Sequence, residues 1–249
     1  MAGKERLDTL VQRRTGLSRT QAQGLILTGK VFGPKGEKLD KPGVRFSPDV
    51  ALTIRETRQR FVSRGGEKLD AAFEAFSLDV TDRICIDVGA STGGFTDCLL
   101  QRGAQRVYAV DVGYGQLDWT LRQDSRVVVL ERTNIRHLEP ERLETLPDFF
   151  TVDCSFISLG LVLPALWRLL AARAEGVCLL KPQFEAGRAD VGKGGVVRDP
   201  AVHERVIALF KDAAAGSGFE TVDMTLSPLE GPAGNKEFLA HLRYPGSYA

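Results

Sequence analysis

The chain has 249 residues, of which 43% are hydrophobic and 26% are charged. This composition is typical of a globular protein with one large domain and a small one attached. The opening residues 1–6 lack the apolar core of a signal peptide, and the most apolar region, residues 159–170, is interrupted by Gly160, Pro164 and Arg168. We therefore expect no membrane span and no membrane partner.

The cysteines and histidines show no metal-binding spacing. The four cysteines are far apart, without a C-x-x-C pair, which favours a reduced, cytoplasmic setting over a disulfide framework or a zinc site. We expect them to be small core residues, and we expect the three unclustered histidines to be structural. These residues are Cys85, Cys98, Cys154, Cys178, His137, His203 and His241.

The charge is distributed unevenly along the chain. Residues 1–60 contain 13 lysines and arginines against 6 acidic residues, whereas the remaining residues contain 20 against 26. This division indicates a basic module that faces nucleic acid, joined to an acidic body. A run of like charges is, however, more often only a solvated face.

Residues 1–59 are predicted to form a small α+β domain. Leu7, Leu10 and Val11 have helical spacing within residues 6–14, and Ser18 with Gln21 forms a capping box for a second helix. Gly29 ends that helix. A turn-rich strand segment at residues 30–36 and a strand near residues 50–54 follow.

The pattern R-L-D followed by G-L-S-R-x-x-A-x-x-x-I-x-x-G-x-V resembles the RNA-binding fold first seen in ribosomal protein S-four. The resemblance implies that basic side chains bind phosphates and supply affinity without reading bases. The alternative is a solubilising helical hairpin. The residues expected to bind RNA here are Arg6, Arg13, Arg14, Arg19 and Lys30.

Residues 60–63 are predicted to be a linker, and residues 64–249 a second domain. Residues 55–62 change from polar to apolar, which suits a linker that docks onto this domain. Five short apolar runs are typical of strands buried on both faces of a parallel sheet: residues 84–88, 107–110, 127–130, 149–152 and 177–180.

Helical stretches lie between these strands, including one that begins at Asp199 and Pro200. Two further strands, at residues 221–226 and 237–242, complete the chain. The prediction is a doubly wound, mostly parallel seven-stranded Rossmann-like α/β sheet behind the small α+β domain.

A glycine-rich turn follows the first strand of this domain and reads Asp87-x-Gly89-x-Ser91-x-Gly93-Gly94. Ser91 stands where the dinucleotide fingerprint has the glycine that admits a pyrophosphate. We therefore expect a smaller, phosphate-free ligand, and S-adenosylmethionine fits.

Polar residues at the next strand ends extend this predicted site. Asp111 can accept both ribose hydroxyls of the cofactor, and Glu131 and Asn134 can border its adenine. Each of them could instead be an ordinary turn residue. The predicted cofactor-binding residues are Asp87, Gly89, Ala90, Ser91, Gly93, Gly94, Asp111, Val112, Glu131, Asn134 and Asp153.

Four charged residues at element ends form a second predicted constellation: Lys68, Asp153, Lys181 and Glu237. Packing explains them poorly, because buried charges are costly unless they are paired. A catalytic cluster explains them better.

The K-D-K-E order resembles the FtsJ-type ribose 2′-O-methyltransferases, and the whole chain resembles the TlyA family, often labelled haemolysin A. The resemblance implies transfer of a methyl group from S-adenosylmethionine to a ribose 2′-hydroxyl of ribosomal RNA, typically of cytidine. Cys154 and Phe61 are slight departures from the family pattern. Matching stretches begin at Ser63, Asp111, Glu131, Asp153, Lys181 and Gly234.

A 2′-hydroxyl is a poor nucleophile, so this reaction needs a base. We assign that role to Lys181, because a second ammonium nearby, that of Lys68, and removal from water both favour the neutral amine. Lys68 and Glu237 are expected to orient Lys181 and the ribose, and Asp153 to balance the charge of the cluster.

The segment after Lys181, residues 183–198, is rich in glycine and lacks the G-K-[ST] of a phosphate-binding loop. It either closes on RNA, with Arg188, Lys193 and Arg198 on phosphates, or is a flexible connector.

Three other functions compete with this prediction. Cys154 could serve a base methyltransferase, but the Pro-Cys expected for cytosine chemistry is missing. A membrane-active haemolysin would need a span or an amphipathic helix. An RNA-binding protein without catalysis is disfavoured by the complete tetrad. No obligate protein partner is evident, and the sequence does not determine the oligomeric state.

Overall fold

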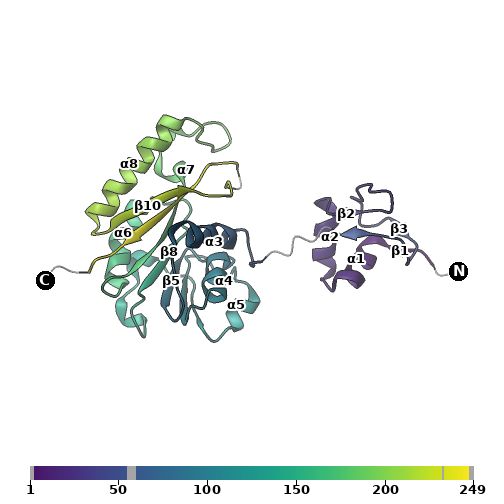
Figure 1. Cartoon of the computed structure of the whole chain (residues 1–249), viewed down its shortest axis with the longest axis horizontal. Helices are drawn as coiled ribbons and strands as arrows, with labels where there is room; N and C mark the ends of the chain where they lie inside the picture. The colour runs from purple at the N-terminus through teal and green to yellow at the C-terminus, as the bar shows by residue number, and fades with distance from the viewer. Residues whose placement is uncertain (1–2, 55–59, 232, 247–249) are drawn as a thin grey trace. The chain divides into compact units, whose positions relative to one another are not determined.

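The computed structural model describes residues 3–54, 60–231 and 233–246. The chain divides into two compact units, Met1–Arg58 and Gln59–Ala249 (Figure 1). Residues 55–59, which belong to the predicted docking segment, lie outside the described residues. Phe61, the first apolar residue after them, is buried in the core of the second unit.

The first unit contains the two predicted helices and two short antiparallel strand pairs. Leu7, Val11, Ala22, Ile26 and Val31 form its core. The capping box of Ser18 and Gln21 is present. The pairing of β1 with β3 was not predicted, because strands of two residues have no periodicity to detect. The elements are β1 (Glu5–Arg6), α1 (Leu7–Thr15), α2 (Arg19–Leu27), β2 (Val31–Phe32), β3 (Arg45–Phe46) and β4 (Thr53–Ile54).

The second unit is built on a seven-stranded sheet with the order β10-β11-β9-β8-β5-β6-β7. Five strands are parallel, and β10 and β11 are antiparallel, so the predicted mostly parallel fold is confirmed. The strands are β5 (Ile84–Val88), β6 (Arg106–Val110), β7 (Val127–Leu130), β8 (Phe149–Val152), β9 (Glu175–Leu180), β10 (Glu220–Leu226) and β11 (Phe238–Arg243).

Helices cover both faces of this sheet. The α helices are α3 (Gly65–Phe76), α4 (Gly94–Gln101), α5 (Trp119–Gln123), α6 (Leu159–Leu166), α7 (Pro182–Glu185) and α8 (Pro200–Gly216). Four 3-10 turns accompany them: η1 (Ile135–His137), η2 (Pro140–Arg142), η3 (Trp167–Leu169) and η4 (Arg188–Asp190).

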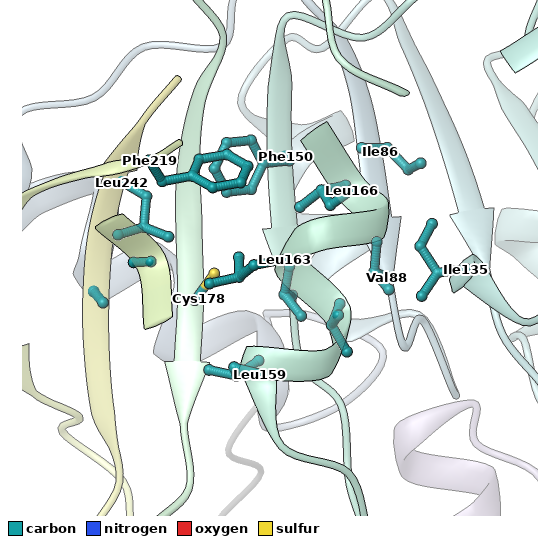
Figure 2. Packing of buried hydrophobic residues seen from close by; sticks show 14 of the residues in the cluster. Ile86, Val88, Ile135, Phe150, Leu159, Leu163, Leu166, Cys178, Phe219 and Leu242 are labelled. Atoms are coloured by element: carbon teal, nitrogen blue, oxygen red, sulfur yellow. The ribbon is translucent and has the colours of Figure 1, made fainter. Parts of the chain in front are cut away.

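Alternate side chains of the central strands enter two separate cores, which is the expected result of the two-residue strand repeat. On one face, Phe73 of α3 and Leu99 of α4 pack with Phe149 of β8. On the other face, α6 and α8 cover Phe150, the next residue of β8. Figure 2 shows Leu163 of α6 in this second core.

The strand order places a topological switch point between β5 and β8. From β5 the chain builds outward through β6 and β7, and from β8 it builds in the other direction through β9. Ligands of open α/β sheets bind outside the carboxyl ends of the strands at such a point. Because β11 is antiparallel to β9, with Phe238 opposite Leu180, the start of β11 lies at this same edge.

The prediction that the four cysteines are core residues is confirmed for three of them. Cys85, Cys98 and Cys178 are buried and free, whereas Cys154 is only partly buried. Among the described helices, none combines the length and the apolar content needed to cross a membrane.

Gly176 provides a test of how closely β8 and β9 pack. A Cβ atom on Gly176 would lie 2.0 Å from the carbonyl oxygen of Phe150. We expect Gly176→Ala to lower the free energy of unfolding by about 2 kcal/mol, because a backbone strand must shift. Urea denaturation followed by circular dichroism measures this loss.

Gly216, at the end of α8, is the matched control, since a Cβ atom on Gly216 would have no neighbouring atom within 4 Å. Gly216→Ala is expected to change stability by less than about 1 kcal/mol. Equal effects of the two substitutions would contradict the close packing at Gly176.

Candidate active site

The four residues of the predicted tetrad line one cavity of about 270 Å³. Lys68 lies in the first turn of α3, Asp153 follows β8, Lys181 follows β9, and Glu237 precedes β11. The sheet brings the last three together, because β8 and β9 are parallel neighbours and β11 enters from the same edge.

Lys68 and Glu237 form a buried ion pair. The Lys68 Nζ atom lies 2.5 Å from Glu237 Oε2 and donates a hydrogen bond to it. Lys68 is 8% exposed and Glu237 is 1% exposed. Each charge depends on the other, because removing one partner would leave an uncompensated charge in the interior.

Lys181 has a different pair of partners. Its Nζ atom lies 2.5 Å from Asp153 Oδ1 and donates a hydrogen bond to Ser155 Oγ at 3.0 Å. The prediction that Lys68 and Glu237 orient Lys181 therefore differs from the contacts in the structure, where Asp153 and Ser155 hold it. The reason is that Glu237 is already paired with Lys68.

A second cavity of about 480 Å³ adjoins the first. The two share Gly89, Ser91, Asp153 and Ser155 in their linings, so Asp153 faces both. The larger cavity combines apolar and polar walls and falls within the size range of small-molecule sites. Its other lining residues include Val88, Val110, Asp111, Val112, Gln116, Thr133, Asn134, Ile135, Cys154, Phe156, Ile157 and Val162.

The glycine turn can follow β5 only because Gly89 has no side chain. Gly89 has a φ of 86°, and a Cβ atom there would lie 2.5 Å from the carbonyl oxygen of Asp153. The amides of Gly89 and Ala90 both donate to the Val110 carbonyl oxygen, at 2.8 and 3.1 Å. The turn is thus held against the residue that faces both cavities.

Asp111 lines the larger cavity while holding the same turn in place. Its carboxylate accepts hydrogen bonds from the amides of Ser91 at 2.8 Å and Gly113 at 2.6 Å. A carboxylate has about four lone-pair sites, so about two remain for hydroxyl groups in the cavity. Asn134 also lines this cavity, and its side chain accepts from the Arg136 amide at 3.1 Å.

Three predicted cofactor residues do not line either cavity. Asp87 is fully buried beneath the turn, where Thr96 and Thr151 donate hydroxyl hydrogen bonds to it at 2.7 and 2.8 Å. Gly93 leaves space for leucine side chains of the neighbouring segment. Glu131 forms an ion pair with a nearby arginine at 2.5 Å. These residues support the site without facing it.

Several lining residues were not predicted from the sequence. Ser155 and Phe156 directly follow Asp153 and Cys154, so their proximity to a predicted residue was the available signal. Ser155 also lines the smaller cavity, and the other residues of that cavity that were missed come from the segment that enters α3 and from the turn and first residues of α4. They are Ser63, Arg64, Gly65, Thr92 and Phe95.

The predicted RNA-binding arginines of the first unit have partners within the chain. Arg6 and Arg19 both pair with the buried carboxylate of Asp8, at 2.9 and 3.4 Å. Arg13 pairs with Glu5 at 3.0 Å, and Arg14 donates to the carbonyl oxygens of residues 48 and 50. The Arg6 and Arg19 side chains are nevertheless 40% and 60% exposed. Lys30 lies directly before β2.

The second group of predicted basic residues surrounds a short hairpin. Arg188 opens η4, and Lys193 lies within the hairpin closed by the bridge between Gly192 and Val196. Arg198 follows it, and all three residues are exposed. The buried Asn235 anchors this hairpin, since its side chain accepts from the Val197 amide at 2.9 Å and donates to the Gly195 carbonyl at 2.8 Å.

Cys154 is poorly suited to nucleophilic attack on a base. Burial raises the pKa of its thiol to about 12. The thiolate is the nucleophilic form, so cytosine C5 chemistry is disfavoured here. The described residues also contain no group of three or more His, Cys, Asp or Glu side chains placed to hold a metal ion.

Comparison with known proteins defines the class of protein. Residues 61–244 match the model of the FtsJ-like methyltransferases. A solved structure from Streptococcus thermophilus, provisionally described as a hemolysin, superimposes with a TM-score of 0.77 and 46% identity. That match covers 98% of this chain and 90% of the other.

Two curated relatives match over most of their length. The 16S/23S rRNA (cytidine-2′-O)-methyltransferase TlyA of Mycobacterium tuberculosis is 49% identical over 98% of this chain and 91% of its own. Hemolysin A of Brachyspira hyodysenteriae is 42% identical over 90% of this chain and 93% of its own. The chain belongs to the FtsJ-like methyltransferases and, within them, to the family that contains TlyA.

Asp87 provides a test of how the turn is supported. Burial is the main cause that raises the pKa of Asp87 from 3.8 to about 6, against the opposing effect of hydrogen bonds from Thr96 and Thr151. The folded state therefore binds a proton more tightly than the unfolded state. The resulting stabilisation is present below about pH 4 and is lost as the pH rises through about 6.

We expect Asp87→Asn to remove this pH dependence. The free energy of unfolding of the wild type, minus that of the variant, should increase by about 2 kcal/mol as the pH falls from about 7 to about 4. Denaturant titrations at several pH values measure it. A constant difference would show that Asp87 does not titrate in this way.

Proposed function

We propose that this protein transfers the methyl group of S-adenosylmethionine to a ribose 2′-hydroxyl of ribosomal RNA, at a cytidine. The observation that carries the proposal is the pair of adjoining cavities with Asp153 in the wall of both. One cavity suits the methyl donor, and the other holds the two lysines and two carboxylates. Reacting groups held on either side of Asp153 would therefore be close neighbours.

The larger cavity fits S-adenosylmethionine. Asp111 would accept hydrogen bonds from the ribose hydroxyls, and the apolar walls at Ile135 and Val162 would contact the adenine. Gly89 and Ser91 line both cavities, so the turn would lie against the amino-acid end. When bound, S-adenosylmethionine supplies an electrophilic methyl group.

Lys181 would serve as the base that takes the proton of the 2′-hydroxyl. A neutral lysine amine has two N–H donors and one lone pair. Ser155 Oγ accepts a hydrogen bond from Nζ, and the Asp153 carboxylate lies beside Nζ as its ionic partner, which leaves the lone pair for a hydroxyl in the smaller cavity. The ammonium formed by proton transfer is stabilised by the carboxylate of Asp153.

Lys68 and Glu237 would orient the ribose on the other side of this cavity. Their mutual pairing keeps both charges stable in a buried place. Since all four tetrad residues line one cavity, an enzyme is favoured over an RNA-binding protein without catalysis.

The RNA would be bound by the basic first unit and by the hairpin at residues 192–196. The S-four-like sequence pattern and the exposed arginines support the first contact. The similarity to TlyA over nearly the full chain supports ribosomal RNA and cytidine as the substrate. A ribosomal substrate also supports action in the cytoplasm, on free RNA or on ribosomal subunits.

Lys181→Ala tests the proposed base. We expect the rate of ribose methylation to fall about 100-fold or more, because general base catalysis is lost, while S-adenosylmethionine binding changes little. Methylation is measured with labelled cofactor and ribosomal particles, and binding by calorimetry. Lys211→Ala, an exposed lysine of α8, is the matched control. Wild-type turnover by the Lys181 variant would reject this role.

Lys193→Ala tests the hairpin contact. Lys193 forms no ion pair with any residue that the structure describes. If it binds phosphate, its loss should reduce the slope of log affinity against log salt by about 1, for any RNA sequence tested. An unchanged slope would place the RNA elsewhere.

A further inference from the structure

We propose that Glu185 is a positioning residue that fixes Ser155 against the Nζ atom of Lys181. This inference rests on the proposed methyl transfer, since it concerns how the base is held. Glu185 lies outside both cavities, so it would act through other residues and not on the substrate.

Glu185 binds the far end of the loop that carries Asp153. Its Oε2 atom accepts a hydrogen bond from the Ser158 hydroxyl at 2.6 Å, and its Oε1 atom accepts from the Leu159 amide at 2.8 Å. Ser158 is also the N-cap of α6 and accepts from the Gly160 amide. Hydrogen bonds to a carboxylate are about twice as strong as neutral ones.

The backbone of the loop between these ends has few hydrogen bonds, although the side chains of Cys154 and Ile157 pack against the core. The amide of Asp153 donates to Val88 at 2.9 Å, but among the described residues no amide of residues 154–157 donates to a backbone carbonyl. Phe156 also has a φ of 65°, an uncommon conformation for an aromatic residue. The hydrogen bonds that hold the loop therefore come from β8 at one end and from Glu185 at the other, with the core packing of Cys154 and Ile157 between them.

Glu185 and Lys181 belong to the same rigid turn. They are joined by α7, in which the Phe184 amide donates to the Lys181 carbonyl oxygen at 2.9 Å. The ring of Phe184 also contacts that of Phe156 in the facing loop, with centroids 5.0 Å apart. Two segments far apart in sequence thus meet at Lys181, at the aromatic pair and at Glu185.

Loss of the Glu185 contacts would change the position of Ser155 relative to Lys181. If Glu185 releases Ser158 and the Leu159 amide, the loop can move away from α7, and Ser155 moves with it. Lys181 would then lose the hydroxyl that accepts the hydrogen bond from its Nζ atom. A misplacement of about 1 Å at a reacting group can lower a rate by about 100-fold.

The test compares kinetics of Glu185 variants on the full-length protein. We expect Glu185→Ala to lower kcat about tenfold to 100-fold, with little change in KM for RNA or in affinity for S-adenosylmethionine. Glu185→Gln should keep kcat within about threefold of wild type, because its amide can accept from Leu159 and donate to Ser158.

Asp79→Ala is the matched control. Asp79 also accepts one amide and one hydroxyl hydrogen bond, from Thr81 at 2.9 and 2.8 Å, but it lies before β5 at the opposite edge of the sheet. Its loss should leave kcat unchanged. Thermal unfolding of each variant shows whether a fall in kcat follows a loss of stability.

A double-mutant cycle provides the second measurement. Glu185→Ala and Ser158→Ala remove two ends of the same contact, so their effects on kcat should not add. If Glu185→Ala does not fold, the Ser158→Ala and Glu185→Gln variants decide: a fall in kcat for the first and near wild-type kcat for the second support the inference.

The outcomes separate this inference from the proposed function. If the wild-type protein does not methylate ribosomal RNA, the proposed function fails. If it does and Glu185→Ala retains its kcat, or the two alanine substitutions add independently, the positioning role of Glu185 is overturned. A rise in KM alone would also overturn it, because that would indicate a contact with RNA.

Discussion

The pairing of opposite charges in a buried place is the constraint on which this active site depends. Lys68 with Glu237 and Lys181 with Asp153 form two ion pairs within one cavity. Neither pair is expected to add much to the free energy of unfolding, because removing two charges from water costs about as much free energy as their attraction contributes. Such pairs are retained where the chemistry requires an amine and a carboxylate at a defined place.

The sheet supplies that defined place. Parallel strands β8 and β9 bring Asp153 and Lys181 to one edge, and the reversal of β11 brings Glu237 there from a distant part of the chain. The fourth residue of the tetrad, Lys68, lies in a helix, α3. The Asp87 carboxylate beneath the turn and the Glu185 carboxylate beside the loop then hold the surrounding backbone.

Much of the fold could be predicted because its signals are local. The run from Ile84 to Val88 is apolar over a strand length, and Ser18 with Gln21 marks a helix start. The two-residue strands of the first unit could not be predicted in the same way, because their pairing depends on contacts distant in sequence. The start of β9 at Glu175 was also missed, since charged residues at a strand end do not extend an apolar run.

For the site, the sequence by itself determined which residue types carry the chemistry. The order of Lys68, Asp153, Lys181 and Glu237 and the turn at Gly89 are readable without coordinates, because residue type and spacing are local properties. Only the tertiary structure decided which amine pairs with which acid, that Ser155 holds Lys181, and that Asp87 faces the core. Partner choice and the direction of a side chain depend on strand register and burial, which arise only when distant segments pack together.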